Sequence, residues 1–343
     1  MNLTMKRTVL YFTAPGEVET RREQNPPLEA GALAVRTEVS AISPGTEMLI
    51  YRGQTPADLP ADESLPSLEG NLHYPLKYGY ACAGRVVAAG SQKLRSWEGR
   101  RVFSFQPHAS TFHALPEQLI PIPEDISAER AVFLPNLETA VNLVHDGAPL
   151  LGERVVVFGQ GIVGLLTTSL LSNFSLDLLI TLDIHEHRRK ASIDAGAHAA
   201  LDASAADTSA TLRELLDGEP TGADLILELS GVPQVLNQAI ETAGFDGRIV
   251  VGSWYGTKQA PLDLGGRFHR QRIRIISSQV STIRPGLSGR WTKSRRLELA
   301  LKRLSEIQPE RWITQRFSIE HAQEAYELID QHPEQTIQVL FTY

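Results

Sequence analysis

A glycine-rich turn between two apolar segments is the part of this sequence whose spacing predicts chemistry. The turn, residues 159–164, reads Gly-Gln-Gly-Ile-Val-Gly and follows Arg154–Phe158, a run of β-branched and aromatic residues. Such a run predicts a strand that is buried on both faces. An apolar helix is expected at Ile162–Leu171 and a second strand at Leu178–Leu182. This order is that of a βαβ unit that binds a dinucleotide.

Each glycine of the turn has its own physical reason. Gly159 permits a tight exit from the strand, Gly161 lets a pyrophosphate approach the backbone, and Gly164 lets the helix pack close to the strand. The N–H groups at the start of the helix, together with its dipole, attract phosphates. We therefore expect the cofactor to contact the residues of the turn, which are Gly159, Gln160, Gly161, Ile162, Val163 and Gly164.

Asp183 ends the second strand, where a carboxylate can accept hydrogen bonds from a ribose diol. A 2′-phosphate would meet like charge there, so the sequence favours NAD over NADP. Arg188, with its neighbours Arg189 and Lys190, weakens this preference because one of these cations can turn towards a phosphate. NADP therefore stays open as the cofactor. A glycine-rich turn in an ordinary α/β domain is the alternative interpretation.

Strands alternate with helices beyond Asp183, which predicts an α/β fold with a parallel, doubly wound sheet. Ligands bind such sheets at the carboxyl ends of the strands. Two of the expected strands end near Leu229 and Gly252. We therefore expect the following residues to lie near the cofactor: Ser230, Gly231, Gly252, Ser253, Ser278 and Gln279.

Composition narrows the functional classes. The chain has 343 residues, enough for two domains, and a net charge of −7 with a pI near 5.8, which argues against a nucleic-acid or anionic-membrane surface. Cys82 is the only cysteine, which excludes an intrachain disulfide and a zinc site built from several thiolates. No apolar run is long enough to span a bilayer and no signal-peptide pattern is present, so a cytoplasmic protein is expected.

The remaining segments predict a β-rich region before the nucleotide-binding part and a carboxyl-terminal region of helices and a strand after it. Strand-like segments lie at Arg7–Phe12 and Gly31–Ser40. A helix is expected at Ser127–Val144, with Ser127 as its cap. Thr292–Glu306 predicts a basic amphipathic helix whose charges are solvated on one face, and Glu320–Gln331 predicts a short helix.

This order of parts resembles the medium-chain dehydrogenase/reductase superfamily over nearly the whole chain. The matching stretches are SAISPGTE, YPLKYGYACAGRVVAAG, FLPNLETAV, GQGIVG with Asp183, and AYELIDQHPEQTIQVLF. The SPGTE and YGY elements are similar to a zinc-free branch that includes bacteriochlorophyllide dehydrogenases. The resemblance implies a GroES-like catalytic domain of residues 1–139 and 283–343, a Rossmann domain of residues 140–282, and a homodimer or homotetramer joined mainly through the nucleotide domains. The expected strand Arg272–Ser277 would lie near that contact.

The sequence departs from the superfamily at the positions that bind catalytic zinc. Where zinc-dependent members have a cysteine, a histidine and a third ligand, this chain has Pro44, Tyr80 and Asn136. Proline cannot ligate, tyrosine seldom does, and an amide is a poor zinc ligand. We therefore expect no metal at this site.

Without zinc, a protein group must manage the proton that accompanies hydride transfer to the nicotinamide. By resemblance, Thr46 matches the hydroxyl residue that begins the proton relay in zinc alcohol dehydrogenases, and Tyr80 stands where a zinc-binding histidine would be. A tyrosine can polarise a carbonyl and exchange a proton. Tyr80 can instead be a space-filling aromatic and Thr46 a turn hydroxyl, and a structural role is expected for Glu47. Lesser candidates are Lys77, Tyr78, His108 and Asn136.

Three functions are compatible with these residues. The first, favoured by Asp183, is a zinc-independent, NAD(P)-dependent alcohol dehydrogenase or ketone reductase. The second is a double-bond reductase of the quinone or enoyl type, and the third is a nucleotide-binding sensor without catalysis. The loop at 54–74 and the cluster of Tyr74, Tyr78 and Tyr80 favour a small-molecule substrate that is cyclic or polyfunctional.

The purified protein is expected to contain no zinc, because Pro44, Tyr80 and Asn136 supply no good ligand. Elemental analysis of the dialysed protein measures this directly. About one tightly held zinc per chain would show the expectation to be wrong.

Overall fold

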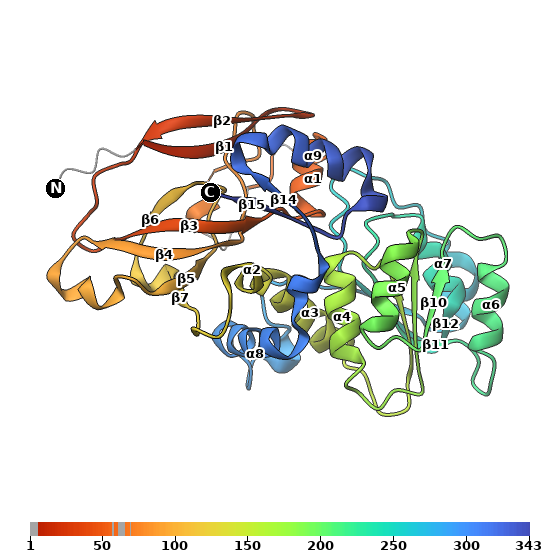
Figure 1. Ribbon diagram of the computed structural model, residues 1–343. Coiled ribbons are helices and arrows are strands. Elements are labelled where there is room, and N and C mark those ends of the chain that lie inside the picture. The colour runs from red at the N-terminus through yellow and green to blue at the C-terminus, as the bar shows by residue number, and fades with distance from the viewer. Residues whose placement is uncertain (1–5, 57, 61–65, 69) are drawn as a thin grey trace. The chain divides into compact units, whose positions relative to one another are not determined.

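The computed structural model describes residues 6–56, 58–60, 66–68 and 70–343 (Figure 1). The chain forms two compact units, one from residues 1–135 with 304–343 and the other from residues 136–303. None of the helices in the described ranges is both long and apolar enough to cross a membrane. Of the loop at 54–74, residues 57, 61–65 and 69 lie outside the described part.

The second unit is built on a parallel sheet in the order β10-β9-β8-β11-β12-β13. Its strands are β8 (Arg154–Phe158), β9 (Leu178–Asp183), β10 (Ala199–Asp202), β11 (Ala223–Glu228), β12 (Ala243–Val251) and β13 (Arg274–Ser277). Its helices are α3 (Leu134–Gly147), α4 (Ile162–Leu171), α5 (Glu186–Asp194), α6 (Thr208–Leu215), α7 (Val235–Thr242) and α8 (Lys293–Ile307), with short helices η4 (Leu264–Phe268) and η5 (Pro285–Leu287). Numbered along the chain, the strand order is 3-2-1-4-5-6, that of the Rossmann fold.

Alternate residues of β8 enter two separate hydrophobic cores. Val156 and Phe158 pack in the core that contains Leu236 and Ile240 of α7. Val155 and Val157 belong to the opposite core, which contains Leu143 of α3 and Leu171 of α4. Because both faces of the strand are buried, every residue after Arg154 is apolar. The predicted doubly wound α/β sheet is confirmed.

The first unit contains a seven-stranded sheet and a separate hairpin among its described residues (Figure 1). Its strands are β1 (Lys6–Ala14), β2 (Glu17–Gln24), β3 (Leu33–Ala41), β4 (Cys82–Ala89), β5 (Arg101–Ser104), β6 (Thr111–Ala114), β7 (Ile120–Pro121), β14 (Ile313–Ser318) and β15 (Gln338–Thr342). Its helices are α1 (Thr46–Tyr51), α2 (Ala128–Ala131) and α9 (Ala322–Gln331), with short helices η1 (Pro66–Leu68), η2 (Gln92–Trp97), η3 (Pro116–Gln118), η6 (Pro309–Trp312), η7 (Ile319–His321) and η8 (Pro333–Gln335). Strands β1 and β2 form the hairpin, and the other seven form the sheet, which is mostly antiparallel.

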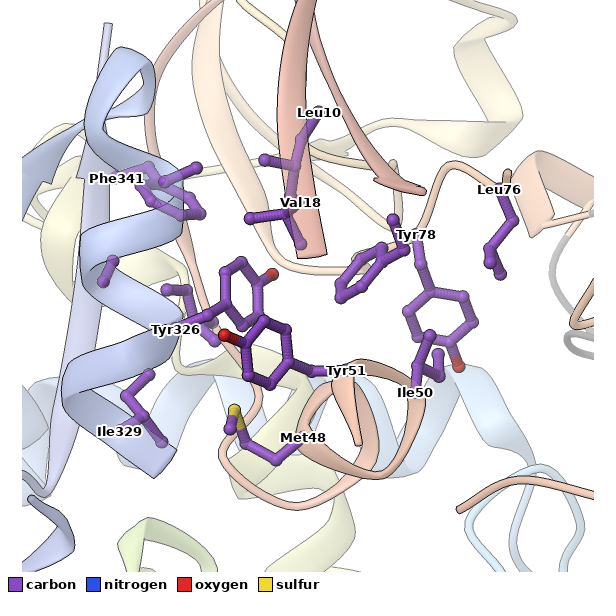
Figure 2. Packing of buried hydrophobic residues seen from close by; sticks show 14 of the residues in the cluster. Leu10, Val18, Met48, Ile50, Tyr51, Leu76, Tyr78, Tyr326, Ile329 and Phe341 are labelled. Carbon is purple, nitrogen blue, oxygen red and sulfur yellow. The ribbon is translucent and has the colours of Figure 1, made fainter. Parts of the chain in front are cut away.

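One apolar core joins distant segments of the first unit (Figure 2). Leu10 of β1, Met48 and Tyr51 of α1, and Tyr326 of α9 all lie in it. The rings of Tyr51 and Tyr326 stack with their centroids 5.4 Å apart. This packing fixes α1 and α9 against the hairpin, and it positions the polar residues that begin α1.

Two helices differ from the sequence prediction. The segment expected as one helix from Ser127 is divided into α2 and α3, and Pro135 in the first turn of α3 lacks the N–H needed to continue a helix from α2. The Ser127 side chain accepts a hydrogen bond from Arg130 N, as predicted for a cap. The prediction that all charges of the basic helix are solvated was wrong for Arg296. That side chain is fully buried in the second unit and donates to Glu138 Oε1, which draws part of the segment 283–303 into this unit.

The hairpin carries a strongly bound carboxylate, Glu23. Arg7 Nη2 lies 2.9 Å and Lys77 Nζ 3.0 Å from its oxygens, and the Tyr11 hydroxyl donates to it as well. Burial by itself raises the pKa of Glu23, but the hydrogen bonds from Tyr11, Lys77 and Arg7 lower it to about 2 from an ordinary value of 4.5. Because the pKa falls on folding, Glu23 stabilises the folded state at any pH above its unfolded-state value.

Glu23→Gln is expected to lower the free energy of unfolding near neutral pH by up to about 3 kcal/mol. The difference from the unmodified protein should shrink as the pH falls from 4.5 towards about 2, since Glu23 becomes protonated over that window. Urea unfolding at a series of pH values measures it. The control is Glu19→Gln on the same strand, because Glu19 pairs with Arg21 in an exposed position and should contribute little at any pH. A constant difference across the pH series would contradict the assignment.

Candidate active site

The glycine turn adopts a backbone that only glycine tolerates. Gly159 has φ of +89°, and a Cβ there would lie 2.6 Å from the backbone of Leu229. A Cβ on Gly164 would lie 2.0 Å from the Gly159 carbonyl oxygen, so α4 packs directly on the turn. A Cβ on Gly161 would meet no atom within 4 Å. The turn is therefore closed by backbone at both ends and open at its centre, where a pyrophosphate would approach.

Gln160 and Asp183 hold the turn to the neighbouring elements. The Gln160 N–H donates to Asp183 Oδ2 over 2.7 Å, and the other carboxylate oxygen accepts from His185 N over 2.9 Å. The Gln160 side chain is fully buried and accepts from Thr168 Oγ1 of α4. Each carboxylate oxygen can accept a second hydrogen bond, so Asp183 can bind a ribose diol without releasing the turn.

The basic residues after Asp183 have separate roles. Arg189 donates to the carbonyl oxygens of Asp183 and Ile184 and pairs with Asp202 at 3.0 Å. Lys190 pairs with Glu186 on the exposed face of α5. Burial lowers the pKa of Arg188, while the Asp183 carboxylate raises it. Arg188 is thus the cation whose charge acts on Asp183, and it is the stronger candidate for contact with a 2′-phosphate.

The residues expected after β11 and β12 are brought together around Glu228. This carboxylate is fully buried at the end of β11, and Oε1 accepts from Ser230 N over 2.8 Å. Its Oε2 accepts from the hydroxyl of Tyr255 over 2.5 Å. Gly231 N donates to Ser253 Oγ over 2.9 Å. The loops at the carboxyl ends of the two strands therefore form one hydrogen-bonded structure beside the glycine turn, since Gly159 itself packs against Leu229.

Gly252 has a packing role in this structure. A Cβ there would lie 2.6 Å from the side chains of both Leu143 and Leu229. Sequence reasoning did not single out Glu228. The available signal was an acidic residue at the end of the otherwise apolar strand β11, where an unpaired charge would be costly.

In the first unit, Tyr80 and Thr46 meet at Ser43. The Tyr80 hydroxyl donates to Ser43 Oγ over 2.6 Å, and Thr46 N donates to the same oxygen over 3.3 Å. The Thr46 hydroxyl has no hydrogen-bond partner among the described residues. The structure therefore joins the two predicted catalytic residues through a serine that sequence reasoning did not name as a candidate.

Behind Ser43 lies a fully buried carboxylate, Glu47. Its Oε1 accepts from Ser43 N over 2.9 Å, and its Oε2 lies 2.9 Å from His108 Nε2. The Tyr326 hydroxyl of α9 donates to the same Oε2 over 2.5 Å. On the far side of the imidazole, His108 Nδ1 lies 2.6 Å from Ser40 Oγ. Two of the partners of Glu47, His108 and Tyr326, are far from it in the sequence, so spacing gave no signal for them.

The lesser candidates are placed elsewhere or in other roles, His108 excepted. Lys77 pairs with Glu23 on the hairpin. Tyr78 is buried in the core of the first unit, where its ring meets that of Tyr80 edge-on at 6.3 Å. Asn136 begins the second unit.

Zinc does not fit these residues. Pro44 has no donor atom, and the Tyr80 hydroxyl is bonded to Ser43. The nearby Glu47 and His108 are bonded to each other and fully buried. Across the described ranges, no three side chains of His, Cys, Asp or Glu are grouped so that they could hold a metal.

Comparison with known proteins finds relatives along the whole chain. Residues 163–297 match the family model of the zinc-binding dehydrogenase domain. The D-guloside 3-dehydrogenase of Escherichia coli (strain K12) is 24% identical over 353 residues, which cover 97% of this chain and 99% of that protein. The (R,R)-butanediol dehydrogenase of Bacillus subtilis (strain 168) is 23% identical over 78% of this chain and 81% of that protein. Among solved structures, the RspB alcohol dehydrogenase of Escherichia coli CFT073 with NADH has a TM-score of 0.79 at 19% identity and covers 98% of this chain and 99% of that one.

Over nearly its whole length the chain is similar to dehydrogenases of the medium-chain dehydrogenase/reductase superfamily. These relatives support an NAD(P)-dependent oxidoreductase, and the solved structures show a fold with a GroES-like part and a Rossmann part. The family-model match begins at residue 163 and so includes none of Pro44, Tyr80 and Asn136. The name of that model therefore carries no information about metal at these positions. The narrower likeness to bacteriochlorophyllide dehydrogenases stays a prediction.

Asp183→Ser is expected to weaken NAD binding roughly 10-fold and to reduce the preference over NADP, because hydrogen bonds to a ribose diol are lost together with the like charge. Calorimetric titration with both nucleotides measures the two dissociation constants. Asp217→Ser, in the exposed loop between α6 and β11, is the matched control and should leave both unchanged. Tighter binding of NADP than of NAD by the unmodified protein would contradict the expected preference.

Proposed function

We propose that this medium-chain dehydrogenase is zinc-independent, prefers NAD, and interconverts a secondary alcohol and a ketone. The pairing of the Tyr80 hydroxyl with Ser43, at a position where zinc-dependent relatives have a ligand, carries the proposal. In this chain the proposed substitute for zinc is therefore a hydroxyl, which can both donate and accept a proton.

The second unit supplies the cofactor site of the proposal. The turn at 159–164 would hold the pyrophosphate and Asp183 the ribose diol, since the centre of the turn is open and the carboxylate retains acceptor capacity. The loops that follow β11 and β12, with Ser230 and Ser253, would lie near the rest of the nucleotide. Bound NAD supplies the hydride acceptor.

Tyr80 is the proposed catalytic residue. During alcohol oxidation the Tyr80 oxygen, in its deprotonated form, takes the proton of the substrate hydroxyl, and the Ser43 hydroxyl turns its hydrogen towards Tyr80 to stabilise that form. The two oxygens lie 2.6 Å apart, which is hydrogen-bonding distance for either direction of donation. In the reverse direction Tyr80 donates to the developing alkoxide. Thr46, which follows Ser43 on the same segment, is proposed as a second hydroxyl towards the substrate.

The proposed substrate is a secondary alcohol that is cyclic or carries further hydroxyl groups. Support comes from relatives named for a guloside, butanediol and sorbitol. Tyr74 and Tyr80 lie on one segment, are only partly buried, and offer apolar faces with polar edges. We further propose a homodimer through the second unit, where β13 is an edge strand of the sheet and can pair with its copy across a two-fold axis.

Tyr80→Phe is expected to lower kcat roughly 10²-fold or more with NAD affinity unchanged, because only the proton-exchanging hydroxyl is removed. Thr46→Val should act in the same direction but more mildly. NADH formation is measured with 2,3-butanediol, sorbitol and methyl glycosides, and NADH consumption with enones. Tyr51→Phe is the matched control, since its hydroxyl is bonded to Gln323 in the core of the same unit.

Full turnover by Tyr80→Phe would show that the phenol only fills space. Turnover of enones alone would identify a double-bond reductase. The absence of hydride exchange with every substrate in the panel would favour a sensor without catalysis.

A further inference from the structure

One buried guanidinium holds the backbone of residues 278–282, the segment that follows β13. Arg296 of α8 is 0% exposed, and its Nη1 donates to the Thr282 carbonyl oxygen over 3.0 Å, while its Nη2 donates to the carbonyl oxygen of Val280. Its Nε and Nη2 also donate to Glu138 Oε1 of α3, over 3.1 and 3.0 Å. The fork of one arginine thus connects this segment to both helices.

A second group of side chains fixes the start of the segment 278–282. Ser278 Oγ donates to Asp146 Oδ2 over 2.7 Å and accepts from Asn142 Nδ2 over 2.9 Å. The same Asn142 nitrogen donates to Asp146 Oδ2 over 2.9 Å, and Asn142 Oδ1 accepts from Arg296 Nη1. The two groups therefore form one network, and its side chains on α3 and α8 are buried.

Holding two helices together does not by itself require such a network. Taking an arginine and a glutamate out of water costs free energy, and apolar side chains of similar volume often stabilise a protein equally well. Burial raises the pKa of Glu138, even though Arg296 lowers it. An apolar pair cannot bind carbonyl groups, however, and the carbonyl groups bound here belong to one segment whose Gln279 and Thr282 are exposed. The network therefore fixes the conformation of a surface segment.

The position of this segment relates it to one end of a dinucleotide. In the sheet, β9 lies on one side of β8, and β11, β12 and β13 follow in order on the other side. With the pyrophosphate at the glycine turn after β8 and the adenosine ribose at Asp183, the nicotinamide riboside would extend towards β11 and β12. Ser278 N donates to the carbonyl oxygen of Val251, the last residue of β12, over 3.0 Å. The segment 278–282 therefore begins beside the edge that the nicotinamide riboside would reach.

We propose that Arg296 and Glu138 are positioning residues for the nicotinamide riboside of the cofactor, on which they act through the segment 278–282. They touch neither the cofactor nor the substrate, and they keep the segment in the conformation that holds the nicotinamide ring in place. The inference rests on the proposed cofactor site, but it does not depend on the substrate or on the role of Tyr80. Loss of the network should weaken binding of the nicotinamide riboside and leave binding of the adenosine half unchanged.

ADP separates the two halves of the cofactor, because it has the adenosine and the pyrophosphate but lacks the nicotinamide riboside. Arg296→Met/Glu138→Gln removes both charges together, so that no unpaired charge is left buried. In calorimetric titration this double variant is expected to bind NADH roughly 10-fold more weakly than the unmodified protein, with ADP affinity unchanged. Arg296→Lys keeps the charge but loses the planar fork, so it should show the same selective loss to a smaller extent.

The matched control is Arg248→Met/Glu153→Gln in the same unit. Arg248 Nη2 lies 2.6 Å from Glu153 Oε2, and its Nε donates to the carbonyl oxygen of Gly147 at the end of α3, so this ion pair also binds a backbone carbonyl group. Among the described residues, neither side chain is hydrogen-bonded to the segment 278–282. The control should therefore leave both NADH and ADP affinity unchanged, and urea unfolding compares the stability of the two double variants.

The fluorescence of bound NADH reports on the nicotinamide ring itself. At saturating NADH, where affinity no longer matters, the ring in Arg296→Met/Glu138→Gln should be more exposed to water. Its emission should therefore lie closer to that of free NADH, whereas the control should give the emission of the unmodified protein. A loss of stability alone would not change the emission of NADH bound to the folded fraction.

Equal weakening of NADH and ADP in Arg296→Met/Glu138→Gln, or no weakening of either, would overturn the proposal, as would an equal loss of NADH affinity in the control. Full NADH affinity in Arg296→Lys would overturn it as well, including the case in which the double variant does not fold. With any of these results and NADH bound by the unmodified protein, the positioning role is wrong while the proposed function stands. If the selective loss is found but Tyr80→Phe is fully active, the proposed catalytic function fails and the positioning role stands.

Discussion

A buried carboxylate, Glu47, is the constraint on which the first unit depends. Burying a carboxylate costs free energy unless hydrogen-bond donors contact its oxygens, so Glu47 needs such donors from the surrounding elements. Those donors come from the Ser43 backbone, from His108 and from Tyr326 of α9. One side chain thereby ties the start of α1, the turn before β6 and a helix near the end of the described chain into a single arrangement.

The second unit also has a buried carboxylate that holds loops together, at the carboxyl end of β11. Glu228 is fully buried and holds the Ser230 backbone together with Tyr255, so the loops after β11 and β12 are fixed by one carboxylate. Burial and the neighbouring Glu228 both raise the pKa of Tyr255 far above its usual range, which keeps the phenol a hydrogen-bond donor at any ordinary pH. In both units a buried acid organises loops rather than the sheet itself, because the sheets are already held by their ladders and apolar faces.

Features that depend on local periodicity could be predicted from the sequence, and those that depend on distant partners could not. The strand before the glycine turn, α4 and the terminal Asp183 follow from spacing within one βαβ unit, and their bounds in the structure match. Strand β2, Glu17–Gln24, was not predicted because its residues are almost all polar and it pairs only with β1. Arg296 was assigned to solvent because nothing near it in the sequence shows that Glu138 lies opposite.

The same distinction applies to the candidate site. Tyr80 and Thr46 were predicted because, by resemblance, they stand at family positions, whereas Ser43 and Tyr326 lie inside the matching stretches but were assigned no role. His108 was noted, but its partners Ser40 and Glu47 are separated from it by more than 60 positions in the chain, and only the folded structure brings them together.

The backbone at Gly79 has a practical consequence for engineering this site. The torsion of +122° excludes ordinary side chains, and the imidazole of His108 fills the space that a side chain would need. In a library that randomises the whole Tyr74–Tyr80 segment to alter substrate range, most variants would therefore carry a side chain that clashes at position 79. Gly79 and the His108 ring pack against each other and have to be kept together. A library that keeps Gly79 preserves this packing while the neighbouring tyrosines are varied.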